Sequence, residues 1–300
     1  MRKIKNLIFS LFLVFIIMFI YLDYDNISIY LKNLITKNNK IELPKSNEYK
    51  RNYGYKRFTN DEDYIPHSIN DIENIFYNIL NNGWDEFIFY CPSDYETCVN
   101  DIEKVSSDAD IMSKIVGYVS PFNAHNTINT TVSSYGEIYV NISKKYSQDE
   151  IIKINNKIEQ IYNELSLKEK DVEEKIKMFH DYLIKNTIYD EDFANNKKSV
   201  YNSSKATGAL LEGHAVCGGY ADAFSIFLDY IKVPNIIISN KNHAWNLVSY
   251  EGIWLHIDPT WNDTEIARFD YEFYMVTTNK LLKLDTKEHE FDKDFFIEAN

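Results

Sequence analysis

The sequence predicts an α+β protein that consists of an apolar N-terminal helix, a small α/β unit and a larger C-terminal domain. Three observations predict this organisation. An apolar stretch occupies residues 7–22, two amphipathic helical patterns follow Ser147, and a segment of alternating polarity on either side of Gly252 is typical of a β-hairpin. With 300 residues, of which 45% are hydrophobic, the chain is long enough to bury a core.

The apolar stretch at residues 7–22 is predicted to be an uncleaved signal anchor, that is, an N-terminal transmembrane helix. Three basic residues lie among residues 1–6, and the bulky residues 19–22 leave no small-x-small site for a signal peptidase. A cleaved signal peptide is the alternative. Because the basic tip at residues 1–6 stays in the cytoplasm, we expect a single-pass protein of the cell membrane whose later residues are extracellular.

The charge of the chain is divided unevenly. The formal net charge is −13, but residues 1–60 carry +7 and the remaining 240 residues therefore carry −20. A body this acidic repels phosphate groups, so we expect no nucleic-acid partner.

The middle of the chain is predicted to contain a linker and a small folded unit. Residues 23–65 are polar and irregular, which predicts a linker or stalk. Residues 66–146 are predicted to form the small α/β unit. A helix is expected from Ser68 to Gly83, because apolar residues recur at helical spacing between these two capping residues.

The rest of this unit is predicted as a strand, a second helix and further strands. The strand covers residues 84–92, and the helix begins with a capping box formed by Ser93 and Glu96. Residues 113–143 are rich in β-branched and aromatic side chains with turn residues between them, which predicts strands.

The C-terminal domain is predicted to cover residues 147–300. A second capping box, Ser147 with Glu150, opens a helix that continues to Leu165, and residues 167–185 show a further helical pattern. These helices lead to the segments that contain the candidate site.

Cys217 is the residue on which the functional prediction depends. Apolar residues at three- and four-residue steps predict a helix that starts at this cysteine and stops before Pro234. In the first turn, free backbone N–H groups and the positive end of the helix dipole favour a thiolate. Gly218 and Gly219 leave room for another backbone to approach the sulfur. A purely structural cysteine needs neither feature.

The other two cysteines, Cys91 and Cys98, lie close together in the sequence. Outside the membrane they would form either a disulfide or two reduced, partly buried thiols. In both cases Cys217 is left without a partner.

Residues 242–261 are predicted to form a β-hairpin that carries a histidine and an aspartate. If the loop consists of Glu251 and Gly252, His243 is the diagonal neighbour of Asp258. If the loop has four residues, His243 lies directly opposite Asp258. Either loop places the imidazole and the carboxylate on one face, whereas a loop of odd length would separate them.

A cysteine at a helix start, followed by this histidine and aspartate, is typical of an activated nucleophile. Cys217 would attack an acyl carbon, His243 would hold and return the proton, and Asp258 would orient the imidazole and stabilise its charged form. A zinc site that includes His214 is an alternative, but it lacks a convincing further ligand. We therefore expect no metal and no cofactor.

These residues carry a resemblance to a known family. Three segments resemble the motif blocks of the transglutaminase-like superfamily, whose catalytic cysteine, histidine and aspartate match Cys217, His243 and Asp258. The segments read "ALLEGHAVCGGYADAFSIFLDYIKVP", "NHAWNLV" and "GIWLHIDPTWND". The likeness extends over roughly residues 147–295. It implies a papain-like core, in which the cysteine helix packs on an antiparallel sheet that carries the other two residues, and cysteine-dependent acyl chemistry.

Two features of animal transglutaminases have no counterpart in this sequence. No tryptophan lies between Trp84 and Trp245, although those enzymes use a tryptophan upstream of the cysteine to hold the oxyanion. The backbone N–H of Cys217 is the candidate donor that remains. No acidic cluster has the spacing of a calcium loop, so a calcium requirement does not carry over.

Other residues near the three motifs are candidates for contact with a substrate, although aromatic residues in a hairpin more often belong to a core. His256 shares a strand face with Asp258 and would either support it or only pack. Four other histidines have no partner that the sequence identifies, namely His67, His125, His180 and His289. The candidates for substrate contact are Gly218, Gly219, Tyr220, Trp245 and Trp261.

The sequence therefore predicts a membrane-anchored extracellular cysteine enzyme whose partner is a protein or peptide substrate at the cell surface. It would form a thioester acyl-enzyme on Cys217 and resolve it by hydrolysis, as a protease or amidase. One alternative is a protein-glutamine γ-glutamyltransferase, which cross-links proteins because an amine resolves the thioester. The other is a cell-surface binding module without catalytic activity.

Overall fold

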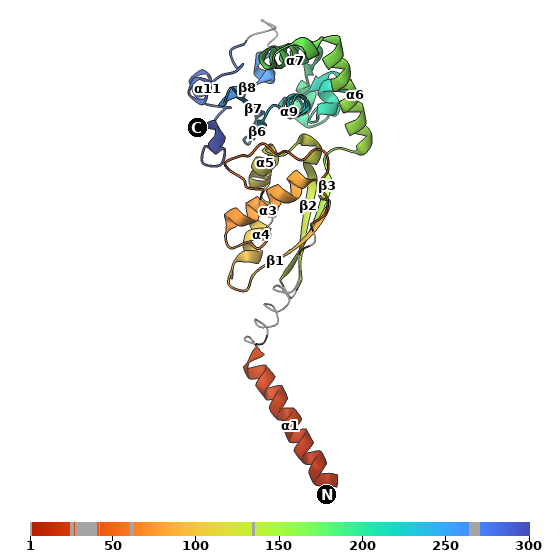
Figure 1. Cartoon of the computed structure of the whole chain (residues 1–300), viewed down its shortest axis with the longest axis vertical. Coiled ribbons are helices and arrows are strands. Elements are labelled where there is room, and N and C mark those ends of the chain that lie inside the picture. Colours follow the sequence, from red (N-terminus) through yellow and green to blue (C-terminus); the bar gives the residue numbers. More distant parts are fainter. Residues whose placement is uncertain are drawn as a thin grey trace.

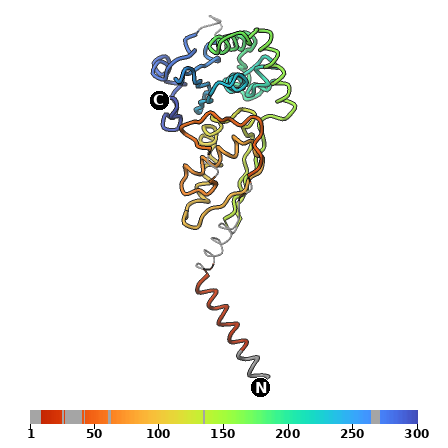
Figure 2. The backbone as a smooth tube through the Cα atoms, viewed as in Figure 1, coloured from red at the N-terminus to blue at the C-terminus, as the bar shows by residue number. Residues whose placement is uncertain are grey.

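The computed structural model describes residues 2–24, 27, 41, 43–60, 63–133, 136–263 and 271–300. Its body consists of two stacked parts, which follow each other in the chain (Figures 1 and 2). The first part, residues 69–144, is drawn in orange and yellow, and the second, residues 148–299, runs from green to blue.

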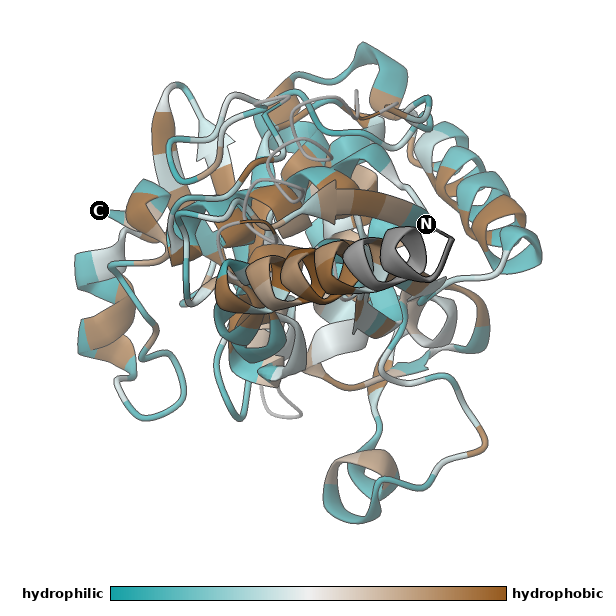
Figure 3. Cartoon of the chain, turned by 90° about the horizontal axis from the view of Figure 1, so that it is seen from below, coloured by the Kyte–Doolittle hydropathy of each residue, from teal (hydrophilic) through white to brown (hydrophobic). Residues whose placement is uncertain are grey.

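The N-terminal helix, α1, covers Arg2–Leu22 and is largely apolar over its described side chains (Figure 3). Over the residues that the structure describes, no helix is both long and apolar enough to cross a membrane. The predicted anchor at residues 7–22 is therefore not supported.

The first part combines three helices with a three-stranded antiparallel sheet in the order β1-β3-β2. Side chains alternate along β3, so that Ile138, Val140 and Ile142 are buried against the helices. The elements are α3 (Ile69–Asn82), β1 (Glu86–Tyr90), α4 (Cys98–Ser107), α5 (Ala109–Gly117), η1 (Pro121–Asn123), β2 (His125–Val132) and β3 (Glu137–Lys144).

The helix predicted from Ser68 to Gly83 is confirmed by α3. The Ser68 hydroxyl accepts a hydrogen bond from the backbone N–H of Asp71, and Gly83 ends the helix in the left-handed conformation, with φ of 73°. Strand β1 confirms the strand predicted at residues 84–92.

The second predicted helix is present, but its predicted start is wrong. Helix α4 begins at Cys98 after Thr97, so Ser93 and Glu96 form no capping box. The Thr97 hydroxyl instead donates to the carboxylate of Asp101, at 2.7 Å, within the first turn.

Residues 109–117 form helix α5, although the region from residue 113 onward was predicted as strands. The carboxylate of Asp108 accepts hydrogen bonds from the backbone N–H groups of Asp110 and Ile111, and this cap favours the helix over the strand propensity of the residues that follow. The strands predicted after them are confirmed by β2 and β3.

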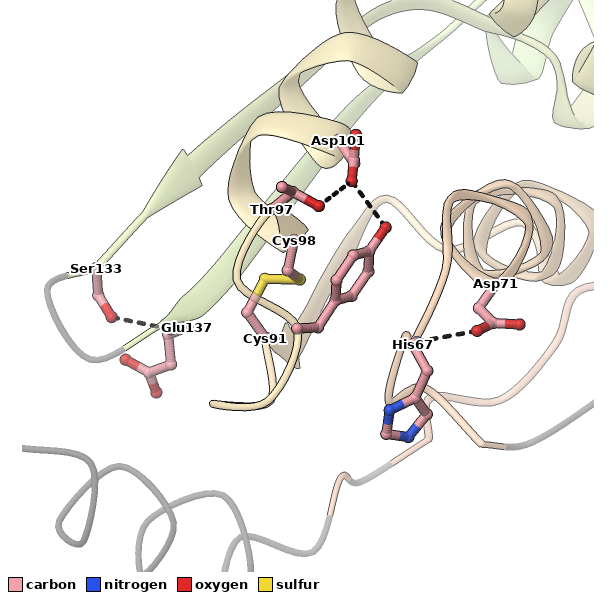
Figure 4. Close-up of a disulfide and its surroundings, with 9 residues drawn as sticks. His67, Asp71, Cys91, Thr97, Cys98, Asp101, Ser133 and Glu137 are labelled. Atoms are coloured by element: carbon pink, nitrogen blue, oxygen red, sulfur yellow. Dashed lines mark hydrogen bonds between the residues drawn. A yellow bond between two sulfur atoms is a disulfide. The ribbon is translucent and has the colours of Figure 1, made fainter.

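Cys91 and Cys98 form a disulfide (Figure 4). The bond joins the end of β1 to the first residue of α4, and Cys217 is left as a free thiol. Of the two alternatives for this cysteine pair, the structure has the disulfide.

Part of the predicted linker is packed against the body. Arg51 is 3% exposed and donates hydrogen bonds to the carboxylate of Asp229 and the backbone carbonyl of Asn235. Tyr55 also donates to that carbonyl, and Phe58 is buried. The segment looks like a linker in sequence because the charge of Arg51 is neutralised by Asp229, which is far away in the chain. Residues 28–40 of the predicted linker lie outside the described residues.

The second part places helices around a three-stranded antiparallel sheet in the order β6-β7-β8. A second, two-stranded sheet pairs β4 with β5 in parallel. The capping box of Ser147 and Glu150 is confirmed at the start of α6. The elements are α6 (Gln148–Glu164), η2 (Leu167–Glu169), α7 (Val172–Asn186), β4 (Ile188–Tyr189), α8 (Glu191–Asn196), the π-helical turn η3 (Gly208–Glu212), β5 (His214–Ala215), α9 (Cys217–Tyr230), β6 (Asn235–Ser239), β7 (Ala244–Tyr250), β8 (Ile253–Ile257), α10 (Pro259–Asn262), α11 (Thr278–Leu284) and η4 (Ile297–Ala299).

The β6-β7-β8 sheet separates two hydrophobic cores. Val248 and Ile257 pack in one core with α6, α7 and α9, which include the cysteine helix. Trp245 and Leu247, on the opposite face, pack in a second core with the first part of the body and the C-terminal segment. The sheet that carries the candidate site is thus buried on both faces.

Candidate active site

Cys217 is the first residue of α9. The residue before it, Val216, is extended and provides no side-chain cap, and its carbonyl accepts the N–H groups of Gly219 and Tyr220. Cys217 and Gly218 lie at the start of the helix, where no carbonyl of an earlier turn can accept a hydrogen bond from their backbone N–H groups. Free N–H groups and the helix dipole favour negative charge at this position, and the cysteine is partly exposed.

The two glycines after Cys217 have different surroundings. A Cβ on Gly219 would lie 2.4 Å from the carbonyl oxygen of Ser203 and 2.9 Å from the Cβ of Ala215. A Cβ on Gly218 would meet only the carbonyl of Ser204, at 3.6 Å. Gly219 thus lets the protein's own loop pack against α9, whereas the prediction was that the glycines open an approach to the sulfur.

The hairpin has the two-residue loop. Tyr250 pairs with Ile253, and the register continues to the pair Asn246 and Ile257. Glu251 and Gly252 both have positive φ, of 50° and 79°, as a type I′ turn requires. This register places His243 just before β7 and Asp258 just after β8, within reach of each other.

His243 and Asp258 form a buried ion pair. The imidazole Nε2 lies 2.5 Å from Oδ2 of Asp258, and neither side chain is appreciably exposed. Burial alone would lower the pKa of His243, but the charge of Asp258, the hydrogen bond between them and the neighbouring Cys217 raise it to about 10. Burial alone would raise the pKa of Asp258, but the charge and hydrogen bond of His243, with a hydrogen bond from His289, hold it well below its usual range.

Cys217 contacts the same imidazole. Its side-chain hydrogen bond to His243 and its electrostatic interaction with the ring contribute to the raised pKa of His243. Because Nε2 of His243 is bound by Asp258, Nδ1 is the ring nitrogen left for Cys217. The three residues therefore line up as thiol, imidazole and carboxylate, the order that an activated cysteine requires.

Asp258 is held by four hydrogen-bond donors. Its Oδ1 accepts from the backbone N–H groups of Thr260 and Trp261, at 2.9 and 3.3 Å, and so caps α10. Its Oδ2 accepts from His243 and from His289, the latter at 3.0 Å. The carboxylate orientation is therefore fixed.

A cleft with a cavity of about 640 Å³ opens beside His243. Tyr189, at the end of β4, lines it, and burial together with electrostatic interactions with Cys217 and Glu191 raises the pKa of this tyrosine to about 12. Its hydroxyl therefore keeps its proton at neutral pH. The lining residues are Thr187, Ile188, Tyr189, Glu191, Asn242, His243, Thr260, Trp261, Asp263 and Glu288.

Of the three aromatic residues predicted to contact a substrate, Trp261 lines this cleft. Tyr220 and Trp245 are fully buried, so the structure gives them no direct contact with a molecule in the cleft. The Tyr220 hydroxyl donates to Asp263 at 2.6 Å. Trp245 stacks on His243, with ring centroids 5.6 Å apart, and so fixes the plane of the imidazole.

His256 supports Trp245 through a hydrogen bond. Its Nδ1 accepts the Trp245 indole N–H at 3.0 Å, and its Nε2 pairs with the Thr278 hydroxyl. Burial lowers the pKa of His256 to about 3, so the ring is neutral.

The structure does not favour a metal at this site. Among the described residues, His243, Asp258 and His289 have potential ligand atoms within 4.8 Å of one another, but these atoms already bind each other through hydrogen bonds. His214, the further ligand of the zinc alternative, stacks on Tyr201 and lines a different cavity from His243.

Sequence reasoning missed three residues of the site. His289 and Asp285 lie far downstream of the motifs, and no spacing rule links them to Asp258. Tyr189 lies in a two-residue strand, and only its parallel pairing with the segment just before Cys217 brings it to the cleft.

Comparison with known proteins supports the predicted family. Residues 159–259 match the family model of the transglutaminase-like superfamily, and this segment includes Cys217, His243 and Asp258. Comparison with curated proteins gives no match.

Two solved structures are similar over about half of the chain. One is the crystal structure of a TGase, with 18% identity and a TM-score of 0.35, covering 47% of this chain and 45% of that one. The other is a candidate cysteine protease from Cytophaga hutchinsonii, with 14% identity and a TM-score of 0.29, covering 51% of this chain and 63% of that one. This chain thus spans less than two thirds of either structure.

Proposed function

We propose, from the premise that residues 159–259 form a transglutaminase-like domain, that this protein is a cysteine enzyme acting as a protease or amidase. The observation that carries the proposal is the buried His243–Asp258 ion pair in contact with the one free thiol of the chain, Cys217. Removing two charges from water costs free energy, so a buried ion pair is weak evidence for stability alone. Beside a cleft and a free thiol, it supports a role in activating a nucleophile.

The reaction follows from the charges. The Cys217 thiolate attacks the carbonyl carbon of an amide, and a carbon–sulfur bond forms as the carbon–nitrogen bond breaks. The His243 imidazolium gives its proton to the leaving amine. The neutral imidazole then takes a proton from water, whose oxygen attacks the thioester carbon. The carbon–sulfur bond then breaks with its electron pair remaining on sulfur, so that the carboxylic acid leaves and the Cys217 thiolate and His243 imidazolium are restored.

Two groups are positioned to stabilise the oxyanion of each tetrahedral intermediate. The backbone N–H of Cys217 is at the free N-terminus of α9. The Tyr189 hydroxyl, which stays protonated at neutral pH, lines the cleft close enough to Cys217 to be affected by its charge. We assign the donor role to both groups.

One feature favours amine transfer as a second candidate. Three acidic residues line the cleft, namely Glu191, Asp263 and Glu288, and among the residues that the structure describes its lining contains no lysine or arginine. Such a lining attracts a cationic amine, which would resolve the thioester in place of water and cross-link a glutamine side chain to a lysine.

The setting we propose is outside the cytoplasm, with a protein or peptide substrate at the cell surface. The Cys91–Cys98 disulfide supports this setting, because such bonds persist in oxidising compartments. Thiol trapping in intact cells tests it, since both cysteines should resist alkylation until a reductant is added.

The decisive experiment is intact mass spectrometry of the full chain after timed exposure to iodoacetamide between pH 5 and pH 9. Cys217 is the one thiol outside the disulfide, so a single added group reports on it. We expect fast alkylation at pH 6 that His243→Ala abolishes. Slow alkylation that is unaffected by His243→Ala would contradict the proposal and favour the non-catalytic binding module.

Hydrolysis and transfer are separated by their products. A glutamine-containing peptide is incubated with the protein with and without an added primary amine. A glutamate or cleaved peptide in both samples indicates hydrolysis, whereas an amine adduct indicates transfer. Cys217→Ala is the control that excludes a contaminating enzyme.

A further inference from the structure

A second histidine contacts the candidate catalytic carboxylate. His289 is fully buried, with Nε2 3.0 Å from Oδ2 of Asp258 and Nδ1 2.9 Å from Oδ2 of Asp285. Carboxylate oxygens only accept hydrogen bonds, so both ring nitrogens must carry a hydrogen. With both carboxylates ionised, His289 is therefore a cation held between two anions.

Both carboxylates are held in the ionised form. Burial would raise the pKa of Asp285, but the hydrogen bond from His289 and those from the backbone N–H groups of Glu288 and Lys287 lower it. Asp258 is held ionised by His243 and His289 in the same way. The cluster of two imidazoliums and two carboxylates is therefore electrically neutral, which permits its burial.

Aromatic rings fix the position of the His289 ring. Phe273 stacks on it, with centroids 5.1 Å apart and planes at 16°, and Trp245 and Trp261 meet it edge-on at 5.0 Å. Aromatic neighbours accommodate a cationic ring. Trp245 also stacks on His243, so both histidines contact the same indole ring.

The two histidines share a single oxygen of Asp258. Oδ1 is occupied by the backbone of α10, so Oδ2 serves both His243 and His289. Without His289, the negative charge at Oδ2 would act on His243 alone.

We propose that His289, held by Asp285, is a positioning residue of the site: it fixes Asp258 and moderates the hold of this carboxylate on His243. This inference rests on the proposed function of Cys217 and His243. Both His289 and Asp285 lie outside the segment matched by the family, residues 159–259, so they are a feature of this chain's C-terminal segment.

The charged neighbours of His289 set the direction of the expected effect. They are Asp258 at the end of β8, His243 before β7 and Asp285 after α11, and the neutral His256 of β8 lies close enough to be affected by its charge. A positive charge here favours the Cys217 thiolate and disfavours the proton on His243. Its loss should therefore shift the whole pH profile of the site upward.

The test compares His289→Gln with wild type in the full chain, using the iodoacetamide rate at Cys217 from pH 5 to pH 9. Glutamine keeps an N–H group but carries no charge. We expect the profile to move up by about one pH unit, so that the rate at pH 6 falls about tenfold. His125→Gln is the control, because it removes a partly buried histidine of β2 whose charged neighbours are Lys144 and Lys145 and not the site, and should leave the profile in place.

Asp285→Asn provides the second variant if His289→Gln fails to show a thermal unfolding transition. We expect a smaller shift in the same direction, and no further shift when it is added to His289→Gln. A folded His289→Gln or Asp285→Asn protein with the wild-type profile would overturn this inference alone. If His243→Ala also leaves the wild-type rate unchanged, the proposed function itself has failed.

Discussion

The segment that matches the family and the segments outside it contribute to the site in different ways. Residues 159–259 provide the thiol, the imidazole and the carboxylate, from helix α9 and the β7–β8 hairpin, which are separated in the chain by β6. The C-terminal segment, residues 271–300, provides none of these groups, but it contributes His289, Asp285 and several buried aromatic residues. The comparison teaches that the reacting groups are local in sequence, whereas the environment that sets their charge is not.

The largest effect on Cys217 is expected from a change inside the matched segment. His243→Ala removes the group that takes the thiol proton, so the alkylation rate at pH 6 should fall by about a hundredfold or more. His214→Ala is the control, because this histidine is nearer to Cys217 in sequence but lines another cavity. Equal rates for the two variants would show that His243 has no special role in activating Cys217.

Asp258→Asn is expected to have the next largest effect. Without the carboxylate charge, burial lowers the pKa of His243 toward or below its usual 6.5, and the alkylation rate at pH 7 should fall by about tenfold. Asparagine can still cap α10 through its side-chain oxygen, so the helix should persist. Titration of the His243 ring by NMR measures the change in pKa directly, and an unchanged value would contradict the ion pair.

The same ion pair predicts how stability depends on pH. The pKa of His243 is raised from 6.5 to about 10, so the stabilisation is fully present below pH 6.5 and is lost as pH rises through 10. The free energy of unfolding should therefore decrease between pH 7 and pH 10 in wild type. In Asp258→Asn that decrease should be smaller. Urea unfolding at several pH values tests this, and equal slopes would show that another group is responsible.

Features that depend on neighbours in the chain could be predicted from the sequence, whereas features that depend on distant segments could not. The hairpin register follows from the Glu251–Gly252 turn and alternating polarity, and it was one of the two registers that place His243 near Asp258. The start of α9 at Cys217 follows from helical spacing. These features depend on neighbours in the chain, and so the sequence reveals them.

Features that depend on distant partners were missed or wrong. Arg51 appeared to belong to a linker because its partner, Asp229, is 178 residues away. The start of α4 was predicted at a Ser93 capping box, but the helix begins after Thr97. Helix α5 was missed because the cap at Asp108 outweighs the strand propensity of the residues that follow it. His289 could not be connected to Asp258, since only the tertiary fold brings the C-terminal segment to the hairpin.

A smaller effect is expected from the two glycines beside Cys217, which separate packing from chemistry. Gly219→Ala forces a Cβ to within 2.4 Å of the Ser203 carbonyl and should cost about 1–3 kcal/mol of stability. Gly218→Ala meets no such contact and should be neutral or stabilise the helix by up to about 1 kcal/mol. Thermal unfolding of the two variants measures the difference. Equal stabilities would mean that the loop containing Ser203 moves to accommodate the added Cβ.

The smallest effect on Cys217 is expected from the disulfide, which lies in the first part of the body. Replacing both Cys91 and Cys98 by serine opens a link across a sequence separation of seven residues, which should lower the free energy of unfolding by about 2 kcal/mol. The alkylation rate of Cys217 should not change, because the disulfide contacts neither the ion pair nor the cleft lining. A changed rate would show that the first part of the body acts on the site through the shared core behind Trp245. The division between reacting groups and their environment would then extend to the whole body of the protein.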